Sequence, residues 1–468
     1  MAESTFSVAI YFVIAVSFWT LVVYVVDAIR RRDRRKNNDN NVRLDELEKK
    51  YIELLNDGSR PGAKVEIRSE VHHFRVSEHR VRVRALKTVQ MVERVPTNEI
   101  ILYVHGTSSS AAGFALAMRR IADRCPDVGV HAIDMPGFGR SDVLGDHGCK
   151  RSLHLSATDV LDQYVRVIDA YVKDVVGERV VLMGHSFGGF VCVHYASRYS
   201  HHVKKLVLIN AAGLYPVIGE WGNYWALFFK ALLPQSICAV ISRMVLKNVV
   251  HRWIDRAIFR DAATATSDPK STFAHYYFEL LCDESVYAHI YVAKFIELGV
   301  TGSRWKDPVL GLLVEMLQDA LFPTCMIHGA HDHLIPSHQG DALSRAFPDL
   351  RVEIIGEGGH SPYADTGIDE FCDVVVSFLR CPSPPPLPQK TKRTTRLRAR
   401  DIDAMMLPFR ASYFPKRTRD AITAQYEVMS CRVAARLLDD DELVHASRYG
   451  PKPVQVQREQ ERRHDDEH

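Results

Sequence analysis

Hydrophobic positions in the central part of the chain form short continuous runs, separated by segments in which they recur every three or four residues. The runs lie at residues 100–105, 128–133, 180–183, 203–210, 325–328 and 352–355. Such runs are typical of strands buried on both faces of a parallel sheet. The helical segments between them, such as 157–176, predict an α/β fold with a mostly parallel, doubly wound sheet. Residues 64–86 alternate like an antiparallel hairpin, which completes a predicted sheet of eight strands.

The N-terminal segment has a different pattern. Residues 6–26 contain no charge, and a helix of about 20 residues spans the hydrocarbon core of a bilayer. A basic cluster follows, formed by Arg30, Arg31, Arg32, Arg34, Arg35 and Lys36. The chain starts M-A-E-S-T, without the positive charge of a signal peptide, so we expect an uncleaved transmembrane anchor. The positive-inside rule then predicts an N-terminus that is outside or lumenal and a cytosolic domain after the anchor.

Two further segments flank the central domain. Residues 27–63 combine the basic cluster with a short amphipathic helix, which we interpret as a spacer that packs on the domain. Residues 381–468 begin with C-P-S-P-P-P-L-P and continue with a basic run at 390–400. We expect a polyproline spacer, and a docking motif for protein partners is the alternative. The tail is predicted to be partly helical and to end in a disordered segment.

Composition narrows the class of protein. The 468 residues are 46% apolar and 25% charged, which are ordinary globular values, and the net charge of +3 does not favour a nucleic-acid partner. Nine cysteines without a C-x-x-C pair predict reduced thiols rather than disulfides or a zinc site. No N-x-[ST] sequence occurs, which agrees with a domain on the cytosolic side.

The apolar run at 180–183 continues into G-H-S-F-G at 184–188 and then into a helical pattern. This is G-x-S-x-G between a strand and a helix, a context that exposes a serine on a sharp turn. Gly184 and Gly188 are expected to lie where a Cβ would clash with neighbouring backbone. Ser186 is therefore a candidate nucleophile. Because serine alone is a weak nucleophile, the hypothesis requires a base, an orienting acid and an oxyanion hole elsewhere in the chain.

Five motifs occur in a fixed order: H-G-T at 105–107, D-M-P-G-F-G-R-S at 134–141, G-H-S-F-G-G at 184–189, H-G-A-H-D at 328–332 and G-G-H at 358–360. With these motifs, residues 64–380 resemble the α/β-hydrolase fold family, and most of all its capped lipases, esterases and C–C hydrolases. The resemblance implies that Ser186 is the nucleophile, Asp332 the acid and His360 the base, in the family's chain order.

The chemistry of such a site agrees with these roles. His360 would take the proton of Ser186, and Asp332 would hold the imidazole in the correct tautomer. Backbone N–H groups of Thr107 and Phe187 would form the oxyanion hole. Relatives of this fold that open epoxides or cut carbon–halogen bonds use an aspartate as nucleophile, so a serine disfavours those reactions.

Other polar residues of the motifs are expected to be structural. His105 would brace the oxyanion loop, and His185 would pack or form hydrogen bonds away from Ser186. Asp134 and Arg140 resemble the family's structural turn. Three histidines crowd around Asp332 (His328, His331 and His333), but their irregular spacing does not favour a metal site. No metal and no cofactor are implied.

Residues 214–321 lie where this family inserts a helical cap, and they are rich in aromatic and aliphatic residues. A lid core over the active site is the expectation, and a lid that also contacts the bilayer is the alternative. Either arrangement predicts an apolar pocket and a lipid-like acyl substrate.

The sequence therefore predicts a membrane-anchored serine hydrolase that cleaves a carboxylic ester, expected to be a lipid acyl ester, through a seryl acyl-enzyme. A thioesterase or amidase on the same three residues is one alternative. A lipid acyltransferase is another, because residues 360–365 read H-x-x-x-x-D. The alternative from a different class is a non-catalytic membrane scaffold.

Overall fold

The computed structural model describes residues 45–57, 65–76, 79–90, 99–107, 109–142, 157–213, 308–319, 321–332 and 349–381, with several positions between 335 and 347. All belong to the first of two units into which the chain divides, residues 1–388. The predicted anchor at 6–26, most of the predicted cap and the tail after residue 381 lie outside the described residues. Within the described part, no helix has both the length and the apolar character needed to cross a membrane.

The described strands form one eight-stranded mixed sheet in the order β1-β2-β4-β3-β5-β6-β7-β8. The strands are β1 (Val65–Val76), β2 (His79–Gln90), β3 (Glu99–Val104), β4 (Val128–Ile133), β5 (Val180–His185), β6 (Val203–Ile209), β7 (Thr324–Gly329) and β8 (Arg351–Ile355). β1 and β2 form an antiparallel hairpin, and β2 is antiparallel to β4, whereas all pairs from β4 to β8 are parallel. The predicted sheet, mostly parallel with an antiparallel hairpin first, is confirmed.

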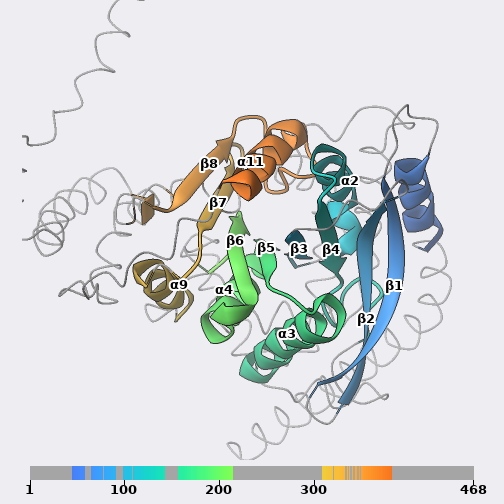
Figure 1. Ribbon diagram of the computed structural model, residues 1–468, viewed down its shortest axis with the longest axis horizontal. Coiled ribbons are helices and arrows are strands. Elements are labelled where there is room, and N and C mark those ends of the chain that lie inside the picture. The colour runs from blue at the N-terminus through green and yellow to red at the C-terminus, as the bar shows by residue number, and fades with distance from the viewer. Residues whose placement is uncertain are drawn as a thin grey trace, which may run out of the picture. The chain divides into compact units, whose positions relative to one another are not determined.

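Helices cover both faces of this sheet. They are α2 (Ala115–Arg124), α3 (Ala157–Tyr171), α4 (Phe187–Arg198), α9 (Pro308–Gln318) and α11 (Ile368–Arg380). Figure 1 shows α2 and α11 on one face and α3, α4 and α9 on the other. The predicted helix at 157–176 is α3 followed by a π-helical turn at Val172–Val176. α9, at the end of the predicted cap, packs against α4.

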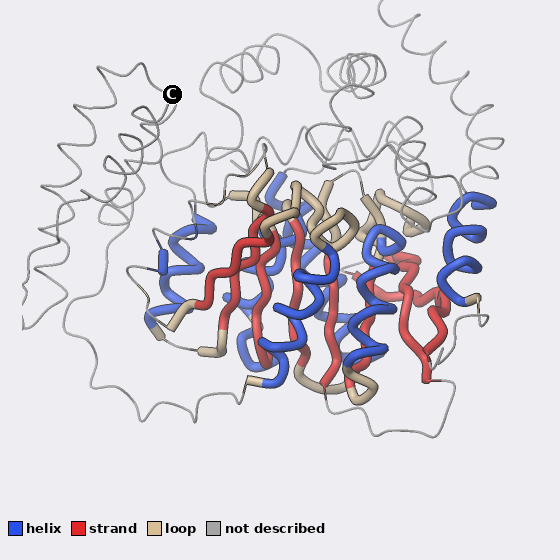
Figure 2. Tube along the Cα trace, turned by 90° about the horizontal axis from the view of Figure 1, so that it is seen from above, coloured by secondary structure: helices blue, strands red, loops and turns tan. Residues whose placement is uncertain are grey.

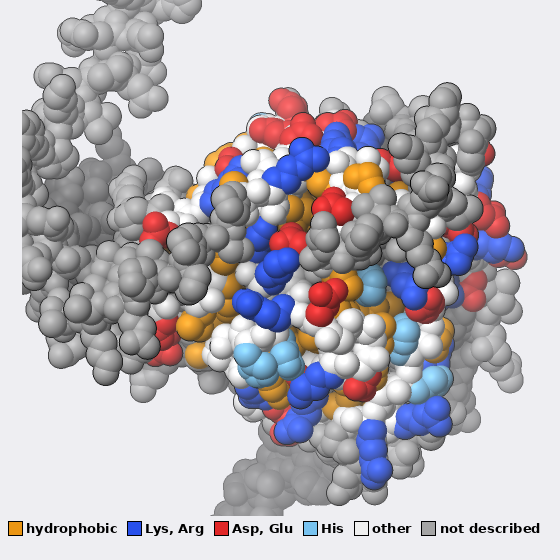
Figure 3. All heavy atoms as spheres, viewed as in Figure 1, with side chains coloured by type: hydrophobic (Ala, Val, Ile, Leu, Met, Phe, Trp, Pro, Cys, Tyr) orange, Lys and Arg blue, Asp and Glu red, His pale blue; other side chains and the backbone are white. Residues whose placement is uncertain are grey.

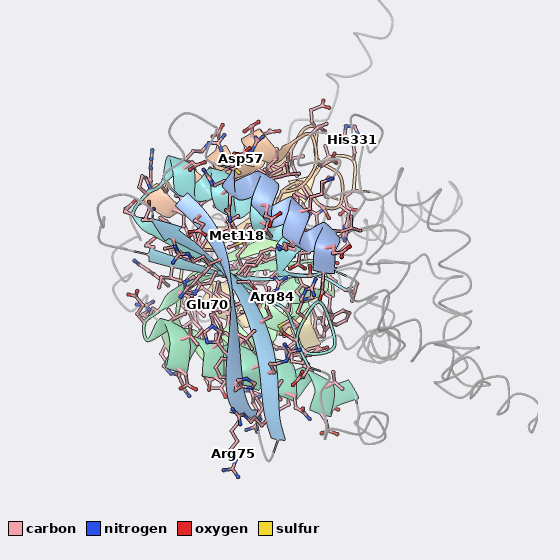
Figure 4. All side chains as sticks on the ribbon, turned by 90° about the vertical axis from the view of Figure 1, so that its right-hand side faces the viewer. Asp57, Glu70, Arg75, Arg84, Met118 and His331 are labelled. Atoms are coloured by element: carbon pink, nitrogen blue, oxygen red, sulfur yellow. The ribbon has the colours of Figure 1, made fainter. Side chains whose placement is uncertain are left out.

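A large hydrophobic core lies between the sheet and α2 and α11. Tyr103 on β3 stacks on Phe114, with ring centroids 3.9 Å apart, and Phe371 of α11 meets the same ring edge-on. A helix at residues 45–56 adds the buried side chains of Tyr51 and Leu55 to this core. The predicted spacer helix therefore packs on the domain as expected, and Figure 4 shows it beside β1 and β2.

The parallel strands place their carboxyl ends on one edge of the sheet. Figure 2 shows most of the described loops gathered along one edge. These loops follow β3, β5, β6, β7 and β8, so residues distant in sequence meet there. Figure 3 shows charged side chains of both signs interspersed with small hydrophobic areas on the face in view.

Candidate active site

Ser186 lies on a strained turn between β5 and α4. Its φ of 51° and ψ of −119° are unusual for a residue other than glycine. The turn is held by backbone hydrogen bonds on both sides. The Ser186 N–H donates to the Ile209 carbonyl oxygen at 2.9 Å, and the Ser186 carbonyl accepts from Ala212 N–H at 2.9 Å and from Gly189 N–H at 3.0 Å. The end of β6 thus fixes the conformation that the motif predicts.

Two glycines let α4 approach the sheet at this turn. A Cβ on Gly184 would lie 2.6 Å from the Gly188 carbonyl oxygen and 2.7 Å from Cys192 Sγ. A Cβ on Gly188 would lie 2.5 Å from the His105 carbonyl oxygen. Real Cβ atoms do not approach backbone atoms so closely, so the predicted reason for both glycines is confirmed.

His360 and Asp332 form a hydrogen-bonded pair at the same edge of the sheet. His360 Nδ1 lies 2.8 Å from Asp332 Oδ2, and both side chains are buried. A carboxylate is an acceptor, so Nδ1 carries the proton and donates it, which leaves Nε2 as the basic nitrogen. Asp332 Oδ1 accepts from Ile335 N–H at 2.9 Å, which fixes the carboxylate further.

The pair lies beside the turn that carries Ser186. His185 Nε2 donates to the His360 carbonyl oxygen at 2.8 Å, and the two imidazole rings are 4.8 Å apart. His185 Nδ1 accepts from the Tyr363 hydroxyl at 3.1 Å. Burial, with a smaller repulsion from His360, holds the pKa of His185 well below its ordinary value, so this ring is neutral. The expected structural role of His185 is confirmed, and its partner is the His360 loop.

Asp365 closes the loop that carries His360. Its Oδ2 accepts from Gly359 N–H at 3.0 Å, and its Oδ1 accepts from Thr366 N–H at 2.8 Å. The side chain is buried, so these hydrogen bonds form in a low-dielectric environment where they strongly fix geometry. The aspartate of the H-x-x-x-x-D pattern, Asp365, therefore binds backbone N–H groups of its own loop.

The predicted oxyanion loop packs against the Ser186 turn. A Cβ on Gly106 would lie 3.0 Å from the Ser186 Cβ, so the backbone before Thr107 faces the serine. His105 Nε2 accepts from Met135 N–H at 3.0 Å, and its Nδ1 donates to the Gly106 carbonyl at 2.6 Å. Burial lowers the pKa of His105, which keeps Nε2 available as an acceptor. The predicted bracing role of His105 is confirmed.

A network of buried charged side chains supports the predicted oxyanion loop. Asp134 accepts from Ala111 N–H at 2.6 Å and from Arg140 N–H at 2.8 Å, which confirms the structural turn. Arg84 of β2 lies between two carboxylates. Its Nε is 3.3 Å from Asp134 Oδ2, and its guanidinium also pairs with Glu48 of helix 45–56. All three side chains are at most 8% exposed. Figure 4 shows Arg84 beneath that helix.

The described residues contain no group of three His, Cys, Asp or Glu side chains arranged to hold a metal ion. The cysteines for which the structure gives a state carry free thiols: Cys125, Cys192, Cys325, Cys372 and Cys381. His333 lies outside the described residues.

Sequence reasoning overlooked several polar residues that hold this site together. They are Glu48, Arg84, Asn210 and Tyr363. The sequence draws attention to Asp365 only through the H-x-x-x-x-D pattern, which does not indicate its role in the loop. For Asn210 a local signal existed, since an asparagine directly after an apolar strand is a common choice for left-handed backbone. Its partners, however, are more than 100 residues away in the chain.

Comparison with known proteins agrees with the fold. The model of the alpha/beta hydrolase family matches residues 101–374, so this chain belongs to that family. An "Abhydrolase domain-containing protein abhd-5.2" of Caenorhabditis elegans is 26% identical over 60% of this chain, and the match spans 59% of the relative's own length.

Two other relatives carry names that state a reaction. A pimeloyl-[acyl-carrier protein] methyl ester esterase of Vibrio atlanticus is 21% identical, and the match covers 60% of this chain and 94% of that protein. A probable 1-acylglycerol-3-phosphate O-acyltransferase of Oryza sativa is 25% identical, and the match covers 67% of this chain and 73% of that protein. This chain is therefore similar both to a protein named for ester hydrolysis and to one named for acyl transfer.

Proposed function

We propose that this protein is a membrane-anchored serine hydrolase that cleaves a carboxylic ester, with a lipid acyl ester as its substrate class. The observation that carries the proposal is the hydrogen bond from His360 Nδ1 to Asp332 Oδ2. It fixes the tautomer in which Nε2 can accept a proton, beside the strained turn of Ser186. An esterase among the relatives supports the same reaction class.

The proposed reaction has two steps, acylation of Ser186 and hydrolysis of the acyl-enzyme. Ser186 Oγ attacks the acyl carbonyl carbon while His360 Nε2 takes the hydroxyl proton, and the N–H groups of Thr107 and Phe187 stabilise the oxyanion. The bond to the alcohol then breaks, and His360 returns the proton to the leaving oxygen. A water molecule repeats the sequence on the acyl-enzyme and releases the acid. Asp332 stabilises the imidazolium in both steps.

Acyl transfer is the main rival, and one relative is named for it. It differs only in the acceptor, which would be an alcohol in place of water. The H-x-x-x-x-D pattern offers little support for a separate acceptor site, because both oxygens of Asp365 accept hydrogen bonds from backbone N–H groups. We therefore favour hydrolysis over transfer.

The test is product analysis with a panel of acyl esters, with the matching thioester and amide, in the presence and absence of a lysophospholipid acceptor. The proposal expects free fatty acid from the ester, and its loss in Ser186→Ala. Acylated acceptor as the main product would establish the transferase, and a thioester or amide preferred over the ester would establish those alternatives. No turnover by a folded protein would favour the scaffold.

The anchor is a separate part of the proposal. It rests on the uncharged segment at 6–26 and the basic cluster that follows. Deletion of residues 2–26 is expected to move the protein from the membrane pellet to the soluble fraction after carbonate washing. Retention of the shortened protein in the washed pellet would contradict a single anchor at this position.

A further inference from the structure

Asn210 lies directly after β6, where the ends of β6 and β7 meet the His360 loop. It is fully buried, and its φ of 42° lies in the left-handed region. Its backbone N–H donates to the Ile327 carbonyl oxygen at 2.9 Å, which ties it to β7. Strained backbone of this kind persists where surrounding interactions fix it, and it is frequent at functional sites.

The Asn210 side chain connects three segments of the site. Its Oδ1 accepts from Gly329 N–H at 3.1 Å. Because a backbone N–H can only donate, this contact fixes the orientation of the amide and directs Nδ2 to the other side. There Nδ2 donates to Asp332 Oδ2 and lies 3.3 Å from the Gly359 carbonyl oxygen.

Asn210 and His360 form hydrogen bonds with the same oxygen of Asp332. Oδ2 of Asp332 is the same atom that accepts the hydrogen bond from His360 Nδ1. One amide therefore holds both the carboxylate and the backbone of the residue before His360. We propose that Asn210 is a positioning residue of this site, which acts through Asp332 and His360. The inference rests on the proposed serine hydrolase function.

The arrangement has a consequence for the charge of the pair. A hydrogen bond to a carboxylate stabilises its negative charge on the oxygen that accepts it. Without the Asn210 donor, Oδ2 attracts more strongly the positive charge that develops on the imidazole during the reaction, so the pH profile of the reaction is expected to move to higher pH. Other titratable side chains in this region are His185 from β5, His105 after β3, His328 and His331 around the end of β7, and Tyr363 and Asp365 after His360. They stay unchanged in the test below.

The experiment measures the rate of fluorophosphonate labelling as a function of pH for the full-length chain in detergent. Asn210→Gly removes the amide and keeps a backbone that tolerates positive φ. The matched control is Asn56→Ala. Asn56 also makes two hydrogen bonds to backbone, with Ile67 N–H at 2.8 Å and with the Ile67 carbonyl at 2.9 Å, but it lies in helix 45–56.

We expect Asn210→Gly to lower the labelling rate at neutral pH by about tenfold or more, because small misplacements of the base are costly. The pH at half-maximal rate should also rise, by about half a unit. Asn56→Ala should leave both quantities at the wild-type values. A wild-type rate and midpoint in Asn210→Gly would overturn the inference, and so would a lower rate with an unchanged midpoint, since that result indicates a structural role only.

A second variant keeps the inference testable if Asn210→Gly does not fold. Asn210→Ala also removes the amide and leaves the unfolded chain less freedom than glycine does. Because the donor to Asp332 Oδ2 is again lost, the same rise in the pH midpoint is expected. An unchanged midpoint would overturn the inference. Wild-type protein that does not label at all would overturn the proposed function itself, whereas normal labelling of both Asn210 variants would overturn only the role of Asn210.

Discussion

Gly188, at the start of α4, lies directly against the backbone at the end of β3. A Cβ at this position would overlap the Val104 carbonyl oxygen and lie 2.5 Å from the His105 carbonyl oxygen. Neither neighbour is a flexible side chain that can move away. The packing of α4 on the sheet, and with it the turn at Ser186, therefore requires a residue without a side chain at position 188.

Gly188→Ala is expected to lower stability by several kcal/mol, at the upper end of single-substitution effects, and to abolish labelling of Ser186. Gly311→Ala is the matched control. Nothing lies within 4 Å of a Cβ at that position, which is inside α9, so alanine should stabilise the protein by about 0.5–1 kcal/mol. Thermal unfolding measures both effects. Equal stability of the two variants would contradict the packing argument.

Asp365→Ala removes the acceptor for Gly359 N–H and Thr366 N–H and should loosen the His360 loop. We expect hydrolysis and any acyl transfer to fall in parallel, by roughly tenfold, because both need the same base. Asp365→Asn, which keeps one acceptor oxygen, should lose less. Initial rates with and without an acceptor alcohol test this. Loss of transfer with intact hydrolysis would instead place Asp365 in an acceptor site.

The buried pair of Glu48 and Arg84 predicts strong coupling between helix 45–56 and β2. Removal of one partner leaves a buried charge with less compensation, because Arg84 keeps Asp134 and Glu48 keeps Arg140. Glu48→Gln and Arg84→Gln should therefore each destabilise the protein by about 2 kcal/mol or more. The double variant should cost much less than the sum. Glu53→Gln is the control on the same helix, because its ion pair with Lys49 is exposed and should contribute less than about 1 kcal/mol. Additive effects in the cycle would contradict the coupling.

His131 on β4 predicts a pH dependence of stability. Burial, with a contribution from nearby Lys87, lowers its pKa to about 4 from an ordinary value of 6.5. The unfolded chain therefore binds a proton at higher pH than the folded chain does. Its contribution to stability is complete above about pH 6.5 and is lost as the pH falls toward 4. His131→Gln should reduce the loss of thermal stability across this window, and an unchanged slope would contradict the assignment.

The sequence predicted the features that depend on local pattern. The continuous apolar runs located β3 to β8, and G-x-S-x-G located the turn at Ser186. The pairing of His360 with Asp332 followed from family resemblance, and the structure shows the two side chains hydrogen-bonded.

The support around these residues could not be predicted in the same way. Arg84 sits in a strand whose alternation gives no sign that one charged side chain is buried, and its partner Glu48 belongs to a separate helix. Asn210 meets Asp332 only because β6 and β7 are neighbours in the sheet. Such contacts depend on tertiary packing, and a single polar residue at the end of a strand is compatible with many different neighbours.

Activation of Ser186 by His360 and Asp332 is the basis of the proposed reaction. It is tested most directly by mapping the fluorophosphonate adduct on the full-length protein by mass spectrometry, in wild type, Ser186→Ala and His360→Gln. We expect an adduct on the peptide that contains Ser186, its absence in Ser186→Ala, and a labelling rate reduced by at least about a hundredfold in His360→Gln. An adduct on another residue, or undiminished labelling of Ser186 without His360, would contradict it.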